Sequence, residues 1–470
     1  MNRTHCPTAL VVSILTALCL LGGCRLPAAP VSRPPMTAIR LAAGDRVLVL
    51  APHPDDEVLG AGGVLREAVR RGLPTRVVFL TNGDSNEWSF LAWRKRPVIL
   101  PQAVMAMGTL RRKEALAAAA ILGVPAANVS FLGYPDYGTL AIWRDHWGDR
   151  PPGRGRLTRA TAVPYETAFR PGAPFKGEEI LADLETILRQ FRPTRIFLSH
   201  PGDRHPDHAA LYLFTRVALW DLQGKVAAIR HPFLIHYPHW PGEKGFHPTE
   251  ELAPPAKLLA GFSWQTLELG REEINVKRLA LAAHHTQFDY SASRLLPFVA
   301  ANELSGDLDL PALVPGGEAV NLQDLAVRIV NQDLEITATL EHSLPQWSAV
   351  NLYAFGYRPG RLFGTMPKLA IRVGPDILSV RDQGHLLPRT TIEAHVTGTK
   401  LLVRLSLSVL GDPDRLFLHA ETRMRANSLS QTPWWVLEMP SSPRSSLSRP
   451  AGGGWEREGW ESEGSPPKGR

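Results

Sequence analysis

The sequence has very little cysteine: only three residues in 470, all within the first 24 positions. The rest of the chain has no thiol, which excludes a disulfide framework, a cysteine nucleophile and a thiolate metal site there. Basic runs and basic–aromatic stripes are also missing, so the formal net charge of +7 does not support nucleic-acid binding. We interpret this charge as a mild surface bias that favours anionic partners such as phospholipid headgroups or acidic glycans.

The first 24 residues are typical of an export signal. The apolar run from Thr8 to Leu21 has signal-peptide length and is short for a membrane span. It leads into Leu21-Gly22-Gly23-Cys24, which resembles the lipobox of bacterial lipoproteins; an ordinary secretory signal or a buried apolar segment is the alternative. We expect cleavage before Cys24, lipidation of this residue, and anchoring to a bacterial envelope membrane, at the outer membrane or the periplasmic face.

Composition and periodicity divide the remaining chain into four segments. Residues 25–45 are rich in Pro and Ala and predict a tether. Over 46–316, buried-type strands alternate with helices, which predicts a Rossmann-like α/β domain with a mostly parallel sheet and helices on both faces. Short, partly alternating strands over 318–440 predict a smaller β-sandwich-like domain. The composition of 441–470 predicts a disordered tail.

Two turns rich in His and Asp follow predicted strands. The first is Pro52-His53-Pro54-Asp55-Asp56-Glu57, and the second runs from His200 to His208 and ends in His205-Pro206-Asp207-His208. Both lie at the carboxyl ends of parallel strands, where open α/β sheets bind ligands. Two imidazoles and one carboxylate make a three-ligand site for Zn²⁺, with Fe²⁺ or another divalent ion as alternatives, and leave a position for water.

Each of these residues also has a structural explanation when taken alone. The acidic residues suit the positive end of a helix dipole, and Pro54 and Pro206 suit a first helical turn. Their combination in two turns favours function. The nearby Gly60-Ala61-Gly62-Gly63 is a poor dinucleotide loop, because it comes after the acidic turn and Leu65 occupies the third glycine position. A nucleotide-dependent oxidoreductase is therefore disfavoured.

The two turns resemble the two signatures of the PIG-L (LmbE-like) family of zinc-dependent deacetylases. The resemblance covers roughly residues 46–300. It implies a zinc-dependent N-deacetylase that hydrolyses the amide of an N-acetylated amino sugar or glycoconjugate. Lesser matches are Thr81-Asn82-Gly83-Asp84, Arg111-x-x-Glu114, Leu132-Gly133-Tyr134-Pro135-Asp136, and Lys277 to Gln287.

The resemblance implies a role for each matching position. It implies one Zn²⁺ per chain, held by His53, Asp56 and His208. Asp55 would be the general base, while His205 would stabilise the oxyanion or act as acid, with Asp207 orienting it. Arg111 and Asp136 would contact the sugar. A non-catalytic glycan-binding lipoprotein is the alternative, and the intact set of His and Asp residues argues against it.

Three parts of the chain are not assigned a fixed role by these matches. The stretch from Asp84 to Gly108 fits a loop that covers the substrate, and Trp143 to Thr167 is a long insertion. The domain over 318–440 could bind glycan or pack against the enzyme. We favour packing on burial statistics for its aromatic residues, which are Trp347, Tyr353, Phe355, Tyr357 and Phe363.

Overall fold

The computed structural model describes most of the chain between residues 36 and 439. The described residues are 36–86, 90, 99–259, 261–308, 322–424 and 427–439. The predicted signal with Cys24, the predicted tail over 441–470 and part of the predicted covering loop lie outside these ranges. Within them, no helix is both long and apolar enough to cross a membrane.

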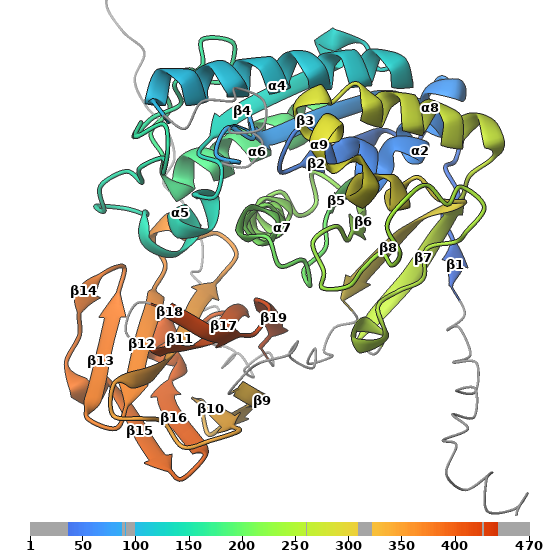
Figure 1. Ribbon diagram of the computed structural model, residues 1–470. Coiled ribbons are helices and arrows are strands. Elements are labelled where there is room, and N and C mark those ends of the chain that lie inside the picture. The colour runs from blue at the N-terminus through green and yellow to red at the C-terminus, as the bar shows by residue number, and fades with distance from the viewer. Residues whose placement is uncertain are drawn as a thin grey trace, which may run out of the picture.

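A five-stranded parallel sheet forms the centre of the N-terminal domain (Figure 1). The strand order is β4-β3-β2-β5-β6, and each neighbouring pair is parallel. Helices cover both faces, which is why the central strand, Val47–Ala51, is a continuous apolar run that is buried throughout. The strands are β2 (Val47–Ala51), β3 (Thr75–Thr81), β4 (Val129–Tyr134), β5 (Arg195–Ser199) and β6 (Ile229–Phe233).

Successive side chains of each strand enter two different cores. Val47 and Val49 pack with one set of helices, whereas Leu48 and Leu50 pack with the other, as the period of two in a strand requires. This arrangement confirms the predicted α/β fold. The first set is α2 (Asp56–Arg70), α4 (Pro101–Leu122) and α8 (Arg271–Ala282); the second is α5 (Thr139–Asp145), α6 (Gly177–Phe191) and α7 (Pro206–Asp221).

Two predicted boundaries are wrong. Strand β1 (Thr37–Ala38) pairs with β7 (Phe262–Glu268), which in turn pairs with β8 (Asn302–Leu308). Ile39 and Leu41 are buried, so the fold begins inside the segment predicted as a tether over 25–45. Helix α4 begins at Pro101, inside the stretch from Asp84 to Gly108 that was predicted as a loop, because Pro is favoured at the first helical position. The predicted covering loop is correspondingly shorter.

The C-terminal domain is built from two antiparallel sheets, as predicted. The orders are β15-β16-β10-β9 and β14-β13-β12-β11-β17-β18, with β19 also paired to β17. In β10 every second residue is buried, which is the pattern of a sheet with one face on a core. The strands are β9 (Leu322–Val330), β10 (Asp333–Leu340), β11 (Ser348–Tyr357), β12 (Lys368–Gly374), β13 (Ile377–Asp382), β14 (His385–Leu386), β15 (Ile392–Thr397), β16 (Lys400–Ser406), β17 (Arg415–Met424), β18 (Asn427–Gln431) and β19 (Trp435–Glu438).

An aromatic cluster joins the two domains. Trp143 of α5 is fully buried, and its ring centroid lies 5.1 Å from that of Phe214 in α7 and 5.1 Å from that of Phe417 in β17. One apolar core therefore runs from the helices under the parallel sheet into the sandwich. Of the aromatic residues considered from the sequence, Tyr353, Phe355, Tyr357 and Phe363 are buried and Trp347 is 57% exposed.

Candidate metal and catalytic site

The first turn connects β2 to α2 in a strained conformation. Asp55 is the N-cap residue of α2 and has φ 118°, a region that non-glycine residues rarely adopt. Its carbonyl accepts the first helical hydrogen bonds, and its backbone N–H donates to Glu57 Oε2 at 2.9 Å. Glu57 Oε1 in turn lies 2.9 Å from His284 Nε2. Strain of this kind persists only when surrounding contacts hold it, and it is common at functional sites.

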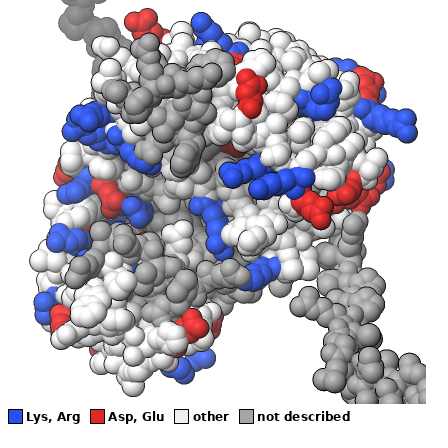
Figure 2. Space-filling view, in the orientation of Figure 1, with Lys and Arg blue, Asp and Glu red and all other residues white. Residues whose placement is uncertain are grey.

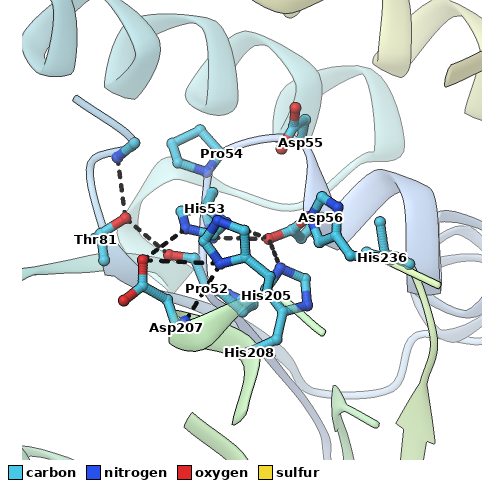
Figure 3. Close-up of polar contacts among 12 residues, drawn as sticks. Pro52, His53, Pro54, Asp55, Asp56, Thr81, His205, Asp207, His208 and His236 are labelled. Carbon is cyan, nitrogen blue, oxygen red and sulfur yellow. Dashed lines mark hydrogen bonds and ion pairs between the residues drawn. The ribbon is translucent and has the colours of Figure 1, made fainter. Parts of the chain in front are cut away.

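Three donor atoms of the predicted metal ligands converge in this region (Figure 3). Asp56 Oδ2 lies 3.0 Å from His53 Nδ1 and 3.1 Å from His208 Nε2. His208 is fully buried, and its Nε2 is aligned for a hydrogen bond with none of the described residues. A buried imidazole nitrogen that lies beside a carboxylate oxygen without an aligned hydrogen bond fits a metal ligand. The donor set of two imidazoles and one carboxylate suits Zn²⁺.

Two further histidines lie next to these ligands. One nitrogen each of His53, His205 and His208 lie within 4.8 Å of one another, as do the ligand atoms of Asp56, His208 and His236. His205 is the N-cap residue of α7, and its Nδ1 accepts a hydrogen bond from the backbone N–H of Asp207 at 3.3 Å. Its proton is thus assigned to Nε2. Burial and the neighbouring His53 hold the pKa of His205 well below its usual value.

Asp203 and Asp207 contact the imidazoles of the two predicted metal ligands, His208 and His53. Asp203 Oδ2 lies 3.0 Å from His208 Nδ1 and accepts hydrogen bonds from the backbone N–H groups of Ile235 and His236. Asp207 Oδ2 lies 3.1 Å from His53 Nε2. Carboxylates behind metal-ligating histidines fix the ring orientation and raise ligand basicity.

The Asp207 carboxylate was expected from the sequence to orient His205, and it does not. Its Oδ2 is 4.0 Å from His205 Nδ1, and it instead accepts hydrogen bonds from the backbone N–H groups of Tyr137 at 2.6 Å and Thr139 at 3.0 Å. The carboxylate turns toward this segment because the start of α5 presents free backbone N–H groups there. Asp207 contacts His205 through its own backbone.

The two predicted sugar-contacting residues have protein partners in the structure. Arg111 Nη1 and Nη2 donate to the carbonyls of Gly83 and Pro54, each at 2.6 Å, and Nη2 lies 3.6 Å from Asp55 Oδ1. Asp136 Oδ1 lies 3.2 Å from His53 Nε2. Both residues line the cleft described below. Arg111 therefore holds the turn that contains Pro54 and Asp55 in place, which sequence matching alone did not indicate.

The carboxyl groups of Asp55 and Asp56 have pKa values shifted in opposite directions. Burial raises the pKa of Asp55 to about 7. The nearby Arg111 guanidinium favours the ionised carboxylate and only partly offsets this effect. Burial opposes ionisation of Asp56 as well, but the charge of His208 holds the pKa of Asp56 well below its usual value. One carboxylate is thus suited to ligation and its neighbour to accepting a proton near neutral pH.

The site opens into a cleft of about 970 Å³. His53, Asp55, Asp56, Asp136 and His205 line its inner end. The outer wall comes from the segment after β6 and from α9 (His285–Leu295). The residues of this outer wall include Tyr237, Trp240, Lys244, Tyr290 and Arg294.

Sequence reasoning missed the contribution of His236 and Asp203. His236 follows β6, and its ring centroid lies 4.7 Å from that of His208. The rule that ligands gather at the carboxyl ends of parallel strands also applies to β6, so that signal was available. Asp203 lies inside the second turn, and only the folded path of that turn shows which imidazole it contacts.

The comparison with protein families agrees with this geometry. Residues 48–219 match the family model described as PIG-L, GlcNAc-PI de-N-acetylase. A PIG-L family domain is present in this chain. The match contains all eight residues predicted for the site and ends before the outer wall of the cleft and the sandwich.

Curated relatives match over the same region. A 1D-myo-inositol 2-acetamido-2-deoxy-alpha-D-glucopyranoside deacetylase of Mycobacterium sp. (strain KMS) is 32% identical over 183 residues, 38% of this chain and 52% of that protein. The deacetylase 1 of the same name from Saccharopolyspora erythraea is 32% identical over 185 residues, which are 38% of this chain and 54% of that protein. The chain spans about half the length of these curated relatives.

Solved structures give weaker similarities. N,N'-diacetylchitobiose deacetylase from Pyrococcus horikoshii has a TM-score of 0.34 and 18% identity, over 63% of this chain and 86% of that one. The zinc-inhibited form of teicoplanin deacetylase Orf2 has a TM-score of 0.38 and 20% identity, over 57% of this chain and all of its own.

Proposed function

We propose that this protein is a metal-dependent deacetylase that hydrolyses the amide of an N-acetylated amino sugar. The convergence of His53, Asp56 and His208 beside a buried Asp55, at the inner end of a cleft, is the observation that carries the proposal. The names of the curated relatives, which are deacetylases of acetamido sugars, support the reaction class. The amide and the sugar would enter from the cleft.

A divalent cation, Zn²⁺ or a similar ion, would be held by His53, Asp56 and His208. When bound, it would polarise the amide carbonyl and increase the acidity of a water molecule. Asp203 and Asp207 keep the two ligand imidazoles in position through contacts of 3.0 and 3.1 Å. These residues should therefore affect metal affinity even though they are not ligands.

The residues around the ligands supply the proton transfers and the charge stabilisation. Asp55, with its raised pKa, takes a proton from the attacking water and gives it to the amine nitrogen as the C–N bond breaks. Arg111 keeps Asp55 aimed into the cleft by binding the carbonyl of Pro54 on one side and approaching the carboxylate to 3.6 Å. His205 accepts at Nδ1, so its Nε2–H can donate to the oxyanion of the tetrahedral intermediate. We therefore favour oxyanion stabilisation over general acid catalysis for His205.

Release of primary amine tests this function. The protein from residue 25 onward, loaded with zinc, would be incubated with N-acetylglucosamine oligomers, and free amine measured with fluorescamine. We expect amine release that disappears with a chelator and returns with the ion. Sugar binding without amine release would instead support a non-catalytic glycan-binding protein.

The metal assignment predicts different results for the two histidines of the second turn. His208→Ala should lose the ion, because two remaining ligands hold a catalytic metal poorly. His205→Ala should keep about one ion per chain and lose rate. Elemental analysis and amine release measure both properties. Metal loss in His205→Ala with retention in His208→Ala would reverse the two roles.

We also propose that the chain is a lipoprotein anchored to the bacterial envelope through Cys24. The apolar run before Leu21-Gly22-Gly23-Cys24 supports this, and the several acyl chains of a bacterial lipoprotein anchor firmly. Wild type should partition into the detergent phase of a phase-separation extraction, and Cys24→Ser into the aqueous phase. If both partition into the aqueous phase, simple secretion replaces the proposal.

A further inference from the structure

The outer wall of the cleft is formed by two segments that lie beyond the PIG-L match. One is the loop after β6, which carries Lys244, and the other is α9, which carries Arg294. The backbone N–H of Gly245 donates to the carbonyl of Ser293 at 2.9 Å. Because this bond joins the neighbours of the two cations, Lys244 and Arg294 lie on one continuous wall.

The acidic residues of the cleft lie at one end of it, together with the cation Arg111, which is 3.6 Å from Asp55. The cleft's three carboxylates, Asp55, Asp56 and Asp136, all lie at the inner end next to the metal ligands. Lys244 and Arg294 are exposed at the outer end, and among the described residues neither has an ion-pair partner. Figure 2 shows Lys and Arg side chains, with some Asp and Glu side chains beside them, around the hollow at the middle of the face that it draws. A cleft lined by cations without counter-charges attracts anions.

Aromatic rings lie between the two ends of the cleft. The ring of Trp240 is fixed, because its Nε1–H donates to the carbonyl of Ala253 at 2.8 Å and it packs edge-on against Phe298, with centroids 5.4 Å apart. Tyr290 of α9 is 43% exposed. Flat, rigid, half-exposed rings of this kind offer apolar contact area at little cost in conformational entropy. The apolar face of a pyranose ring is complementary to such a surface.

We propose that the outer cleft is a subsite for an acidic sugar next to the acetamido sugar in an oligosaccharide. Its carboxylate would lie between Lys244 and Arg294, and its ring would contact Trp240 or Tyr290. The inference rests on the proposed function, since deacetylation places the acetamido sugar at the inner end. It names the substrate class as an acidic glycan, which agrees with the formal net charge of +7.

Matched disaccharides test the subsite. Each would carry N-acetylglucosamine at the reacting position, next to glucuronic acid, glucose or glucose phosphate. With zinc-loaded wild type at low salt, we expect kcat/KM for the glucuronic acid compound to exceed that for the glucose compound by about five- to tenfold. The preference should disappear in Lys244→Gln/Arg294→Gln and weaken at high salt.

The control is Lys225→Gln/Arg328→Gln, which removes the same charge at exposed positions after α7 and on β9. This control should keep the preference. Equal kcat/KM for the acidic and neutral compounds, or a preference for the phosphate alone, would overturn the acidic-sugar subsite and leave the deacetylase function standing.

Absence of turnover on every compound would overturn the proposed function instead. Calorimetric binding of the same compounds then decides the inference separately. Tighter binding of the glucuronic acid compound that depends on Lys244 and Arg294 would support the subsite. Equal binding of the acidic and neutral compounds would overturn it.

Discussion

Replacing Asp55 by Asn is expected to lower kcat for amide hydrolysis by roughly 10²–10⁴-fold, the range typical of a lost general base. The fold and the metal should be retained. Asn has the same shape, tolerates the positive φ of 118° that this N-cap position requires, and leaves His53, Asp56 and His208 unchanged. What it removes is the carboxylate that takes the proton from water.

The measurement combines steady-state kinetics, elemental analysis and thermal unfolding of the same preparations. Asp55→Asn should lose kcat with little change in KM, bind about one ion per chain, and unfold near the wild-type temperature. Asp145→Asn is a matched control, since that side chain is 52% exposed at the end of α5, and it should behave like wild type. Full activity of Asp55→Asn would show that another group is the base.

The fold could be predicted because its signals are local. Apolar runs at Val47–Ala51 and at residues 196–198, followed by helices that begin at acidic or proline-containing turns, specify parallel strands that are covered on both faces. The alternating pattern of β10 specifies a sheet with one buried face. The end of the tether was wrong because the two-residue strand β1 is defined by its pairing with β7, about 230 residues away in the sequence.

The residues proposed to bind the metal could be singled out because they lie in two short turns at strand ends. Their supporting contacts could not, because these depend on how separate loops meet. Arg111 lies about three turns into α4, and nothing in the neighbouring sequence indicates that it binds the carbonyls of Pro54 and Gly83. Likewise, the Asp207 carboxylate contacts His53 rather than His205 because backbone N–H groups at the start of α5 bind it.

The interface between the domains gives the second large expected effect. Trp143→Ala should lower the free energy of unfolding by about 3–5 kcal/mol, the range for removing a large buried aromatic side chain. The fully buried indole contacts rings from both domains, including Phe214 of α7 and Phe417 of β17, with centroids 5.1 Å away in each case. The space it leaves is bordered by a sheet and a helix, neither of which can collapse into it without losing its own packing.

Trp347→Ala is the matched control. This tryptophan lies in the sandwich, on the other side of the interface from α5, and 57% of its surface is exposed. It should change the free energy of unfolding by no more than about 0.5 kcal/mol, as surface substitutions usually do. Urea unfolding followed by far-UV circular dichroism compares the two variants. Equal stability of Trp143→Ala and Trp347→Ala would mean that the domains do not depend on this core.

A functional effect should accompany the loss of stability. Thr139 lies one turn before Trp143 in α5, and its backbone N–H donates to Asp207, which contacts His53. Loosening α5 should therefore weaken the support of a metal ligand and increase the rate at which a chelator removes the ion. Trp347→Ala should not change that rate. If Trp143→Ala loses stability but releases the ion at the wild-type rate, the sandwich stabilises the fold without positioning the site.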